Sequence, residues 1–214
     1  MINISVILIE PENPGNTGAI CRAMKNFDFE ELILVGPTFD VDTSELRNRA
    51  KWANDLVDKI ELIPKYNEKA LKKIRKDFDY LIATTAKLGR DYNILRSPIT
   101  PEQLAERLSE LELQKNNDDK KSKKGKKNIT IGIVMGREGS GLTNNELELM
   151  DFTVTIPTSK KYGTMNLSHA TTIIMYEIFK KISEENIISH IAPISEPEKK
   201  QLMKLLDEGG GAIV

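Results

Sequence analysis

The sequence has almost no cysteine or histidine. Cys21 is the only cysteine among 214 residues, and His169 and His190 are the only histidines. A single cysteine cannot form an intramolecular disulfide, and three scattered side chains do not have the spacing of a zinc site built on Cys and His. We therefore expect neither a disulfide framework nor a metal centre.

Long apolar runs are also missing. No run reaches the roughly 18 residues that a membrane-spanning helix requires. The first ten residues lack the basic start and the small-residue cleavage site of a secretory signal. These absences predict a globular protein of the cytoplasm without a membrane partner.

Positive and negative charges nearly balance over the whole chain but not along it. The segment 114–128 holds seven lysines and two aspartates, whereas the rest of the chain carries 24 basic against 30 acidic side chains, a balance of −6. A nucleic acid would therefore have to bind through local basic patches or through this lysine-rich segment. Because the segment contains no apolar residue, we predict a disordered, solvated insertion.

Short β-rich apolar segments alternate with helical patterns. Six segments are expected to be strands, namely residues 2–9, 32–35, 60–63, 80–84, 129–135 and 152–156. Several are apolar at consecutive positions, which is typical of parallel strands covered on both faces. The alternation predicts an α/β fold with a mainly parallel sheet flanked by helices, in which ligands bind at loops that leave the carboxyl ends of strands.

Capping patterns mark several helix starts. Residues 100–103 (TPEQ) and 143–146 (TNNE) have the spacing of a capping box. Residues 166–183 carry apolar side chains at intervals of three and four, which predicts an amphipathic helix packed on the sheet. We expect one domain over residues 1–183, followed by a helical tail over 184–214 whose helix opens at Ser195.

Two loops have compositions that suit a ligand-binding site. Residues 11–18 follow the first strand and run into a helix expected over 19–26, with Asn16 or Thr17 as its cap. Arg22 would then lie about one turn inside the helix, where its side chain can reach back over the loop. Residues 157–166, which join the last strand to the long helix, are polar, basic and aromatic, with Thr164 or Asn166 as a cap.

A glycine-rich loop lies between an apolar strand and a capped helix. Residues 136–141 contain three glycines, and glycine lets backbone approach a ligand closely. Their order is G-x-x-G-x-G rather than GxGxxG, and no Walker Lys-Ser/Thr follows. The loop therefore favours a small ligand held on backbone amides and carbonyls over a nucleotide phosphate.

Three ordered motifs give the chain a family resemblance. They are residues 16–23 (NTGAICRA), 135–143 (MGREGSGLT) and 164–170 (TMNLSHA). In this order they resemble the motifs of the SpoU (SPOUT-class) RNA ribose 2′-O-methyltransferases. The first and third look most like the TrmJ subgroup, which modifies the tRNA anticodon loop, and the resemblance covers residues 2–183.

This resemblance implies a C-terminal trefoil knot, a rare exception to the rule against threaded chains. It also implies a homodimer whose active sites draw on both subunits, S-adenosylmethionine as cofactor, and tRNA as substrate. The modified nucleotide would be a cytidine or uridine at the start of the anticodon loop. Matched by motif, the cofactor residues would be Thr84, Thr85, Ala86, Gly136, Ile156, Gly163, Thr164 and Met165.

Arg22 matches the family's candidate catalytic residue. A guanidinium stays protonated in proteins, so we expect Arg22 to hold the RNA phosphate and stabilise the developing alkoxide rather than act as a simple base. Thr164 would position the ribose or the cofactor, while Asn16, Glu138 and Asn166 would hold the loops and the dimer contact in place. RNA contacts are expected at a few local cations, namely Arg22, Arg47, Arg49, Lys51, Lys160 and Lys161.

Two other classes of protein stay open as alternatives. A dinucleotide-binding oxidoreductase is disfavoured by the glycine order and by the lack of an acidic residue near position 160. A non-catalytic RNA-binding module would use the same basic side chains as a methyltransferase. Binding of S-adenosylhomocysteine separates these classes, because only the methyltransferase is expected to bind it.

Overall fold

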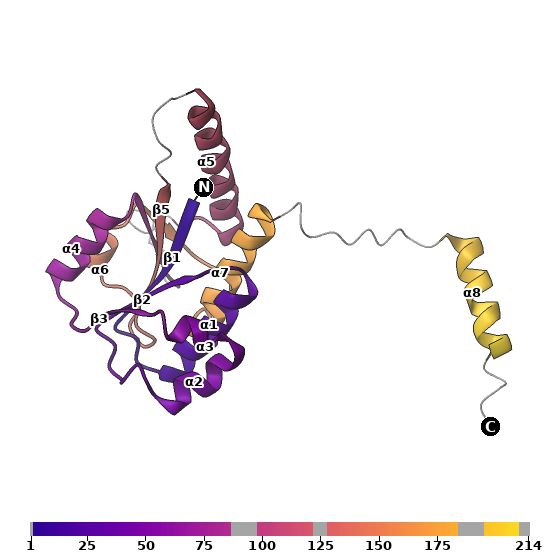
Figure 1. The fold of residues 1–214 in the computed structure, drawn as a ribbon, viewed down its shortest axis with the longest axis horizontal. Coiled ribbons are helices and arrows are strands. Elements are labelled where there is room, and N and C mark those ends of the chain that lie inside the picture. The colour runs from indigo at the N-terminus through magenta and orange to yellow at the C-terminus, as the bar shows by residue number, and fades with distance from the viewer. Residues whose placement is uncertain (1, 87–97, 122–127, 184–194, 210–214) are drawn as a thin grey trace. The chain divides into compact units, whose positions relative to one another are not determined.

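The computed structural model describes residues 2–86, 98–121, 128–183 and 195–209 (Figure 1). The chain divides into two compact units, Met1–Glu184 and Glu185–Val214. This division lies next to the boundary predicted between residues 183 and 184. The second unit contains the helix α8 (Glu196–Gly209), which Ser195 opens by donating its backbone N–H and its hydroxyl to the Glu198 carboxylate.

A six-stranded sheet forms the centre of the first unit, in the order β3-β2-β1-β5-β4-β6. Its strands are β1 (Ile2–Ile9), β2 (Glu31–Val35), β3 (Glu61–Ile63), β4 (Tyr80–Thr84), β5 (Ile129–Met135) and β6 (Phe152–Val154). Every pairing between neighbouring strands is parallel. The six predicted strands are confirmed, with ends that differ by at most two residues.

Helices cover both faces of the sheet, as the consecutive apolar residues predict. The helical elements of this unit are α1 (Pro14–Asn26), α2 (Ser44–Ala50), η1 (Lys51–Ala53), α3 (Asn54–Val57), α4 (Glu68–Asp77), α5 (Pro101–Lys121), α6 (Asn144–Leu147) and α7 (Leu167–Ile182). Val6 and Leu8 of β1 pack with side chains of α1, α2, α5 and α7. Ile7 and Ile9 point to the other face, where they pack with α4 and α6.

The helix α1 begins earlier than the sequence predicts. It starts at Pro14, and the side chain of Asn13 caps it by accepting a hydrogen bond from the Asn16 backbone N–H at 3.0 Å. Proline fits the first turn of a helix because its missing N–H would have no intrahelical partner. The predicted start at residue 19 is therefore wrong, and Asn16 and Thr17 lie inside the helix rather than at its cap.

The other predicted helix starts are confirmed. Thr100 and Gln103 exchange backbone-to-side-chain hydrogen bonds at the start of α5, and Thr143 and Glu146 form a capping box on α6. Asn166 caps α7. The helix α5 continues through residues 114–121, where the composition predicted a solvated loop, and residues 122–127 of that segment lie outside the described residues.

The strand β6 lies between the two ends of the connection from β4 to α5. On one side, the Thr85 N–H donates to the Val154 carbonyl at 2.9 Å. On the other, the Ile99 N–H donates to the Thr153 carbonyl at 2.9 Å, and the Thr155 N–H donates to the Ile99 carbonyl at 3.0 Å. The chain therefore passes between residues 85 and 99 on its way to α7.

Candidate functional site

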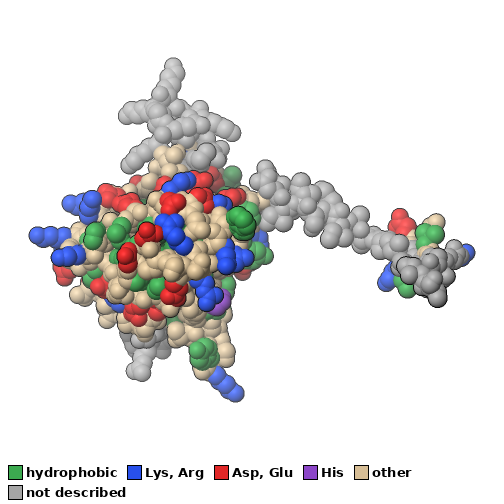
Figure 2. Space-filling model, turned by 60° about the horizontal axis from the view of Figure 1, so that its bottom comes forward, with side chains coloured by type: hydrophobic (Ala, Val, Ile, Leu, Met, Phe, Trp, Pro, Cys, Tyr) green, Lys and Arg blue, Asp and Glu red, His purple; other side chains and the backbone are tan. Residues whose placement is uncertain are grey.

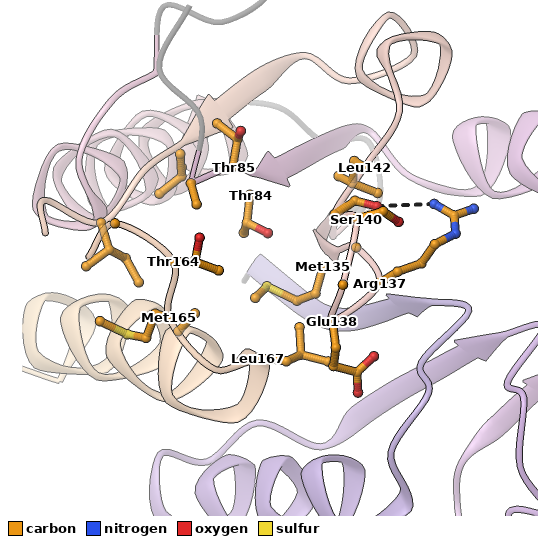
Figure 3. Close-up of a pocket in the computed structure, with 18 of the residues that line it drawn as sticks. Thr84, Thr85, Met135, Arg137, Glu138, Ser140, Leu142, Thr164, Met165 and Leu167 are labelled. Carbon is orange, nitrogen blue, oxygen red and sulfur yellow. Dashed lines mark hydrogen bonds between the residues drawn. The ribbon is translucent and has the colours of Figure 1, made fainter. Parts of the chain in front are cut away.

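A cavity of about 240 Å³ lies where β4, β5 and β6 end (Figure 3). Because neighbouring parallel strands end at the same edge of a sheet, the loops that follow them meet there. The loops supply the wall residues Thr84–Ala86, Gly136–Leu142, Ile156, Thr158 and Gly163–Met165, and α7 adds Leu167, Ala170 and Ile174. The second and third motifs, separate in sequence, thus form one concave surface.

The structure brings all eight predicted cofactor residues to this cavity. They are Thr84, Thr85, Ala86, Gly136, Ile156, Gly163, Thr164 and Met165. Their role as cofactor ligands stays a prediction. The sequence predicts a ligand site at the loops that leave the carboxyl ends of the strands, and these residues lie together there.

Apolar side chains and backbone form most of the cavity wall. The apolar members are Ala86, Met135, Leu142, Val154, Ile156, Met165, Leu167, Ala170 and Ile174. Among the lining residues that the structure describes, Arg137 and Glu138 are the only charged ones, and none is a lysine. Such a wall suits a ligand with large apolar parts and polar edges better than a di- or triphosphate.

Arg137 is committed to the structure of the glycine-rich loop. Its guanidinium donates to the Glu10 carboxylate at 2.5 and 2.8 Å, to the Glu146 carboxylate at 2.9 and 3.2 Å, and to the Gly141 carbonyl at 3.2 Å. It also lies 5.1 Å from the centre of the Tyr66 ring. Figure 3 shows the side chain extending away from Thr84 and Thr164, so it is not positioned to bind a ligand phosphate in the cavity.

Glu146 is the buried centre of this network, with a relative exposure of 1%. Burial raises the pKa of Glu146, but hydrogen bonds from Arg137, Tyr66 and the Thr143 backbone outweigh it, so the pKa lies below its ordinary value. Burial and the hydrogen bond to Glu146 raise the pKa of Tyr66 to about 12. The capping pattern predicted one role of Glu146, while nothing in the sequence pointed to its partners Arg137 and Tyr66.

A second, more open hollow adjoins the cavity. Its lining residues are Glu12, Asn13, Asn16, Glu138, Tyr162, Thr164, Met165, Asn166 and Leu167. Glu138, Thr164, Met165 and Leu167 line both spaces. The first motif therefore meets the other two at this hollow.

Hydrogen bonds link one residue from each motif. The Glu138 carboxylate accepts from the Asn16 side-chain amide at 3.2 Å and from the backbone N–H groups of Glu12 and Asn13 at 2.9 and 3.2 Å. The Asn166 side-chain amide donates to the Asn16 side-chain oxygen at 3.0 Å. The structure thus brings together Asn16, Glu138 and Asn166, the three residues predicted to hold the loops in place.

Arg22 lies apart from both spaces. It is exposed on α1, it lines neither the cavity nor the hollow, and it makes no hydrogen bond or ion pair with any residue that the structure describes. Within a single chain, the predicted catalytic arginine and the predicted cofactor residues are therefore not brought together.

The other predicted RNA-binding cations lie in two places. Arg49 and Lys51 are exposed at α2 and η1, and Lys160 and Lys161 are exposed in the loop after β6. Arg47 differs, because it forms ion pairs with Asp42 at 2.6 Å and Asp58 at 2.9 Å. Figure 2 shows basic and acidic side chains interspersed over one face, without one large basic surface on that face.

Over the described ranges, no group of three or more His, Cys, Asp or Glu side chains is placed to hold a metal ion. None of the described helices is both long enough and apolar enough to cross a membrane.

Comparison with known proteins identifies the family. The SpoU rRNA Methylase family matches residues 3–176. A relative from Methanocaldococcus jannaschii, named tRNA (cytidine-2′-O-)-methyltransferase TrmJ, is 38% identical over 209 residues, which cover 97% of this chain and 81% of the relative.

Solved structures share the fold. A probable methylase family protein from Haemophilus influenzae has a TM-score of 0.68 at 25% identity, covering 98% of this chain and 78% of its own. An AdoMet-bound rRNA methyltransferase from Sinorhizobium meliloti has a TM-score of 0.59 at 20% identity, covering 87% and 57%. The family resemblance carried by the three motifs is confirmed, and the chain belongs to the SpoU methylase family.

Proposed function

We propose that this protein transfers the methyl group of S-adenosylmethionine to a ribose 2′-hydroxyl of tRNA. The observation that carries the proposal is the meeting of all three motifs around one cavity and its adjoining hollow. The substrate class is supported by the relative from Methanocaldococcus jannaschii, which is named a tRNA 2′-O-methyltransferase. A homodimer acting on the anticodon loop, as in the TrmJ subgroup, is part of the same proposal.

The cavity fits the proposed cofactor. Adenine and a methionyl chain need apolar walls and backbone hydrogen-bonding groups, and the lining offers both. The eight predicted cofactor residues would hold S-adenosylmethionine, which supplies an electrophilic methyl group when it is bound. The AdoMet-bound methyltransferase with the same fold supports this assignment.

The hollow fits the ribose. Methyl transfer requires the 2′-hydroxyl to approach in line and to lose its proton. Thr164 lines both spaces, so it lies where the ribose and the cofactor would meet. Asn16, Glu138 and Asn166 would act as positioning residues, because their hydrogen bonds hold the walls of the hollow together.

A homodimer would complete the active site. Arg22 is exposed on α1 and lines neither space in its own chain, so we propose that it reaches the site of the partner subunit. There it would hold the RNA phosphate and stabilise charge that develops on the ribose oxygen.

A trefoil knot is also part of the proposal. Its support is the path of the chain at β6, which passes between residues 85 and 99 before it reaches α7. A knot requires one segment of the chain to pass through a loop formed by another segment. Here β6 lies between the two ends of the connection from β4 to α5.

A methyl-transfer assay tests the function. The protein is incubated with S-adenosylmethionine and bulk tRNA, and the tRNA nucleosides are analysed by mass spectrometry. We expect 2′-O-methylated cytidine or uridine that maps to the first nucleotide of the anticodon loop. If the protein binds tRNA but neither binds S-adenosylhomocysteine nor produces a methylated nucleoside, the non-catalytic RNA-binding alternative is correct.

A further inference from the structure

Trp52 is an exposed aromatic side chain with no role in the cavity or the hollow. It is the only tryptophan of the chain, and its relative exposure of 93% is the highest among the large hydrophobic side chains that the structure describes. A fully exposed indole is a costly feature for a side chain that usually packs at least partly into a core. Such exposure suggests that the indole serves to bind a partner.

The backbone around Trp52 is held firmly while the indole points outward. Ala50 and Ala53, on either side, are buried at 0% and 1% exposure. The Lys51 carbonyl accepts a hydrogen bond from the Asn54 side chain at 2.8 Å, and the Trp52 carbonyl accepts one from the Lys25 ammonium at 3.0 Å. The indole is thus displayed on a fixed turn and not on a frayed end.

Cations lie around this turn, at the seam between α1 and α2. A Cβ atom added to Gly18 would lie 2.9 Å from the Arg49 Cβ, and Lys25 of the same helix contacts the Trp52 carbonyl. Arg22 lies between Gly18 and Lys25 on one stripe of α1, because residues three and four apart share a helix face. Lys25 is therefore the cation in contact with the turn, and three more lie along the same seam or next to Trp52 in sequence, namely Arg22, Arg49 and Lys51.

These three cations are available to a ligand. None of them forms an ion pair with a described residue, whereas Lys25 is paired with Asp55 at 2.5 Å, and Arg47 neutralises Asp42 and Asp58. An aromatic platform with unpaired cations beside it matches single-stranded RNA, whose bases stack and whose phosphates are anionic. Apolar side chains around Trp52 would favour a protein partner instead.

We propose that Trp52 stacks on an unpaired nucleobase of the RNA substrate while Arg49 and Lys51 bind the adjacent phosphates. The inference rests on the proposed function and adds a recognition site to it. Asn16 borders the hollow, and Lys25 lies nine residues further along α1, which corresponds to about 14 Å at 1.5 Å per residue. The base on Trp52 is therefore a different nucleotide from one that enters the hollow of the same chain.

The single tryptophan makes the contact directly observable. Its fluorescence is followed while the protein is titrated with an anticodon stem-loop RNA, and separately with the same strand annealed to its full complement. We expect strong quenching by the stem-loop, which has unpaired bases, and little quenching by the duplex. Equal responses to the two RNAs, or no response at saturating stem-loop, would overturn the stacking contact.

Variants test the energetic role. Trp52→Ala should weaken stem-loop binding and raise the KM for tRNA about tenfold, with kcat unchanged, because stacking contributes to binding away from the reacting atoms. Trp52→Phe should keep most of the affinity, and Leu62→Ala, at an exposed site on β3, should change nothing. The salt dependence of binding should keep its slope in Trp52→Ala but lose about one unit in Lys51→Ala.

Failure of the stacking contact is distinguishable from failure of the proposed function. If Trp52→Ala converts a dimer into monomers in sedimentation experiments, Trp52 is a subunit contact and the proposal fails. If the wild-type protein methylates tRNA while Trp52→Ala binds RNA normally, the stacking site is wrong but the proposed function stands. A wild-type protein that methylates no tRNA refutes the proposed function itself.

Discussion

Glu146 shows how one buried carboxylate stabilises the glycine-rich loop. Its pKa lies below the ordinary value of 4.5, so the folded protein favours the ionised form. The stabilisation is therefore complete above pH 4.5 and is lost as the pH falls below that value towards the lower pKa of the folded state.

Glu146→Gln should destabilise the protein at pH 7 by about 3 kcal/mol, because Arg137 loses a buried partner. It should also reduce the loss of stability below pH 4.5. Urea unfolding at pH 7 and at acidic pH measures both effects. The control is Glu148→Gln, an exposed site two residues further on, and equal stabilities for the two variants would contradict the buried ion pair.

Cys21 gives a second test at the scale of the residue. Burial raises the pKa of the Cys21 thiol to about 12, and the side chain is fully buried in α1. Because the thiolate is the reactive form, iodoacetamide should not label the native protein at pH 8 and should label it readily in urea. Rapid native labelling would show that α1 is not packed as described.

The contact between α1 and α2 explains a glycine of the first motif. A Cβ atom at Gly18 would lie 2.2 Å from the Leu46 carbonyl oxygen, which is backbone and cannot rotate away. Gly18→Ala should therefore cost about 1–3 kcal/mol of unfolding free energy. Gly163→Ala is the control, since its Cβ would meet the Thr158 hydroxyl at an ordinary 3.7 Å, and thermal unfolding should separate the two variants clearly.

Gly136, like Gly18, has no room for a Cβ atom, so its substitution is a poor probe of the cavity. A Cβ atom there would lie 2.3 Å from the backbone of Gly141, so even alanine would distort the loop. Replacing Gly136 tests whether the loop can close, not whether the cavity can be filled. A substitution from the more rigid helix α7 is the better probe.

Local patterns made the strands and most helix starts predictable. Consecutive apolar residues in β1 and β5 indicate a doubly covered parallel sheet, and Thr143 with Glu146 indicates a cap. The start of α1 was missed although Asn13 and Pro14 have the pattern of a helix cap and first helical position, because Gly15 and Gly18 disfavour a helix unless a second helix packs closely against them.

Long-range contacts in the site depend on the fold and left little trace in the sequence. Arg137 and Glu10 are 127 positions apart, and no periodicity relates them. The three motifs could be assigned to one family by their order, whereas the placement of Arg22 outside its own cavity required the structure.

At the scale of the whole molecule, the proposed dimer can be tested by mixing variants. Arg22→Ala should lower kcat about 100-fold or more and change tRNA affinity much less, if the arginine acts on the transition state. A heterodimer of Arg22→Ala with a cavity variant retains one intact site, so it should recover roughly half of the wild-type rate. No recovery in verified heterodimers would mean that each active site is built within one chain.

The most direct measurement of the central claim is calorimetric titration with S-adenosylhomocysteine and with NAD. Ala170 lines the cavity from α7, so Ala170→Leu should fill it, whereas Lys73→Leu places a leucine on the exposed face of α4, away from the cavity. We predict that S-adenosylhomocysteine binds the wild type and Lys73→Leu, that folded Ala170→Leu loses most of this affinity, and that NAD binds none of them. Failure of S-adenosylhomocysteine to bind the wild type, or equal binding by Ala170→Leu, would contradict the assignment of the cavity as the cofactor site.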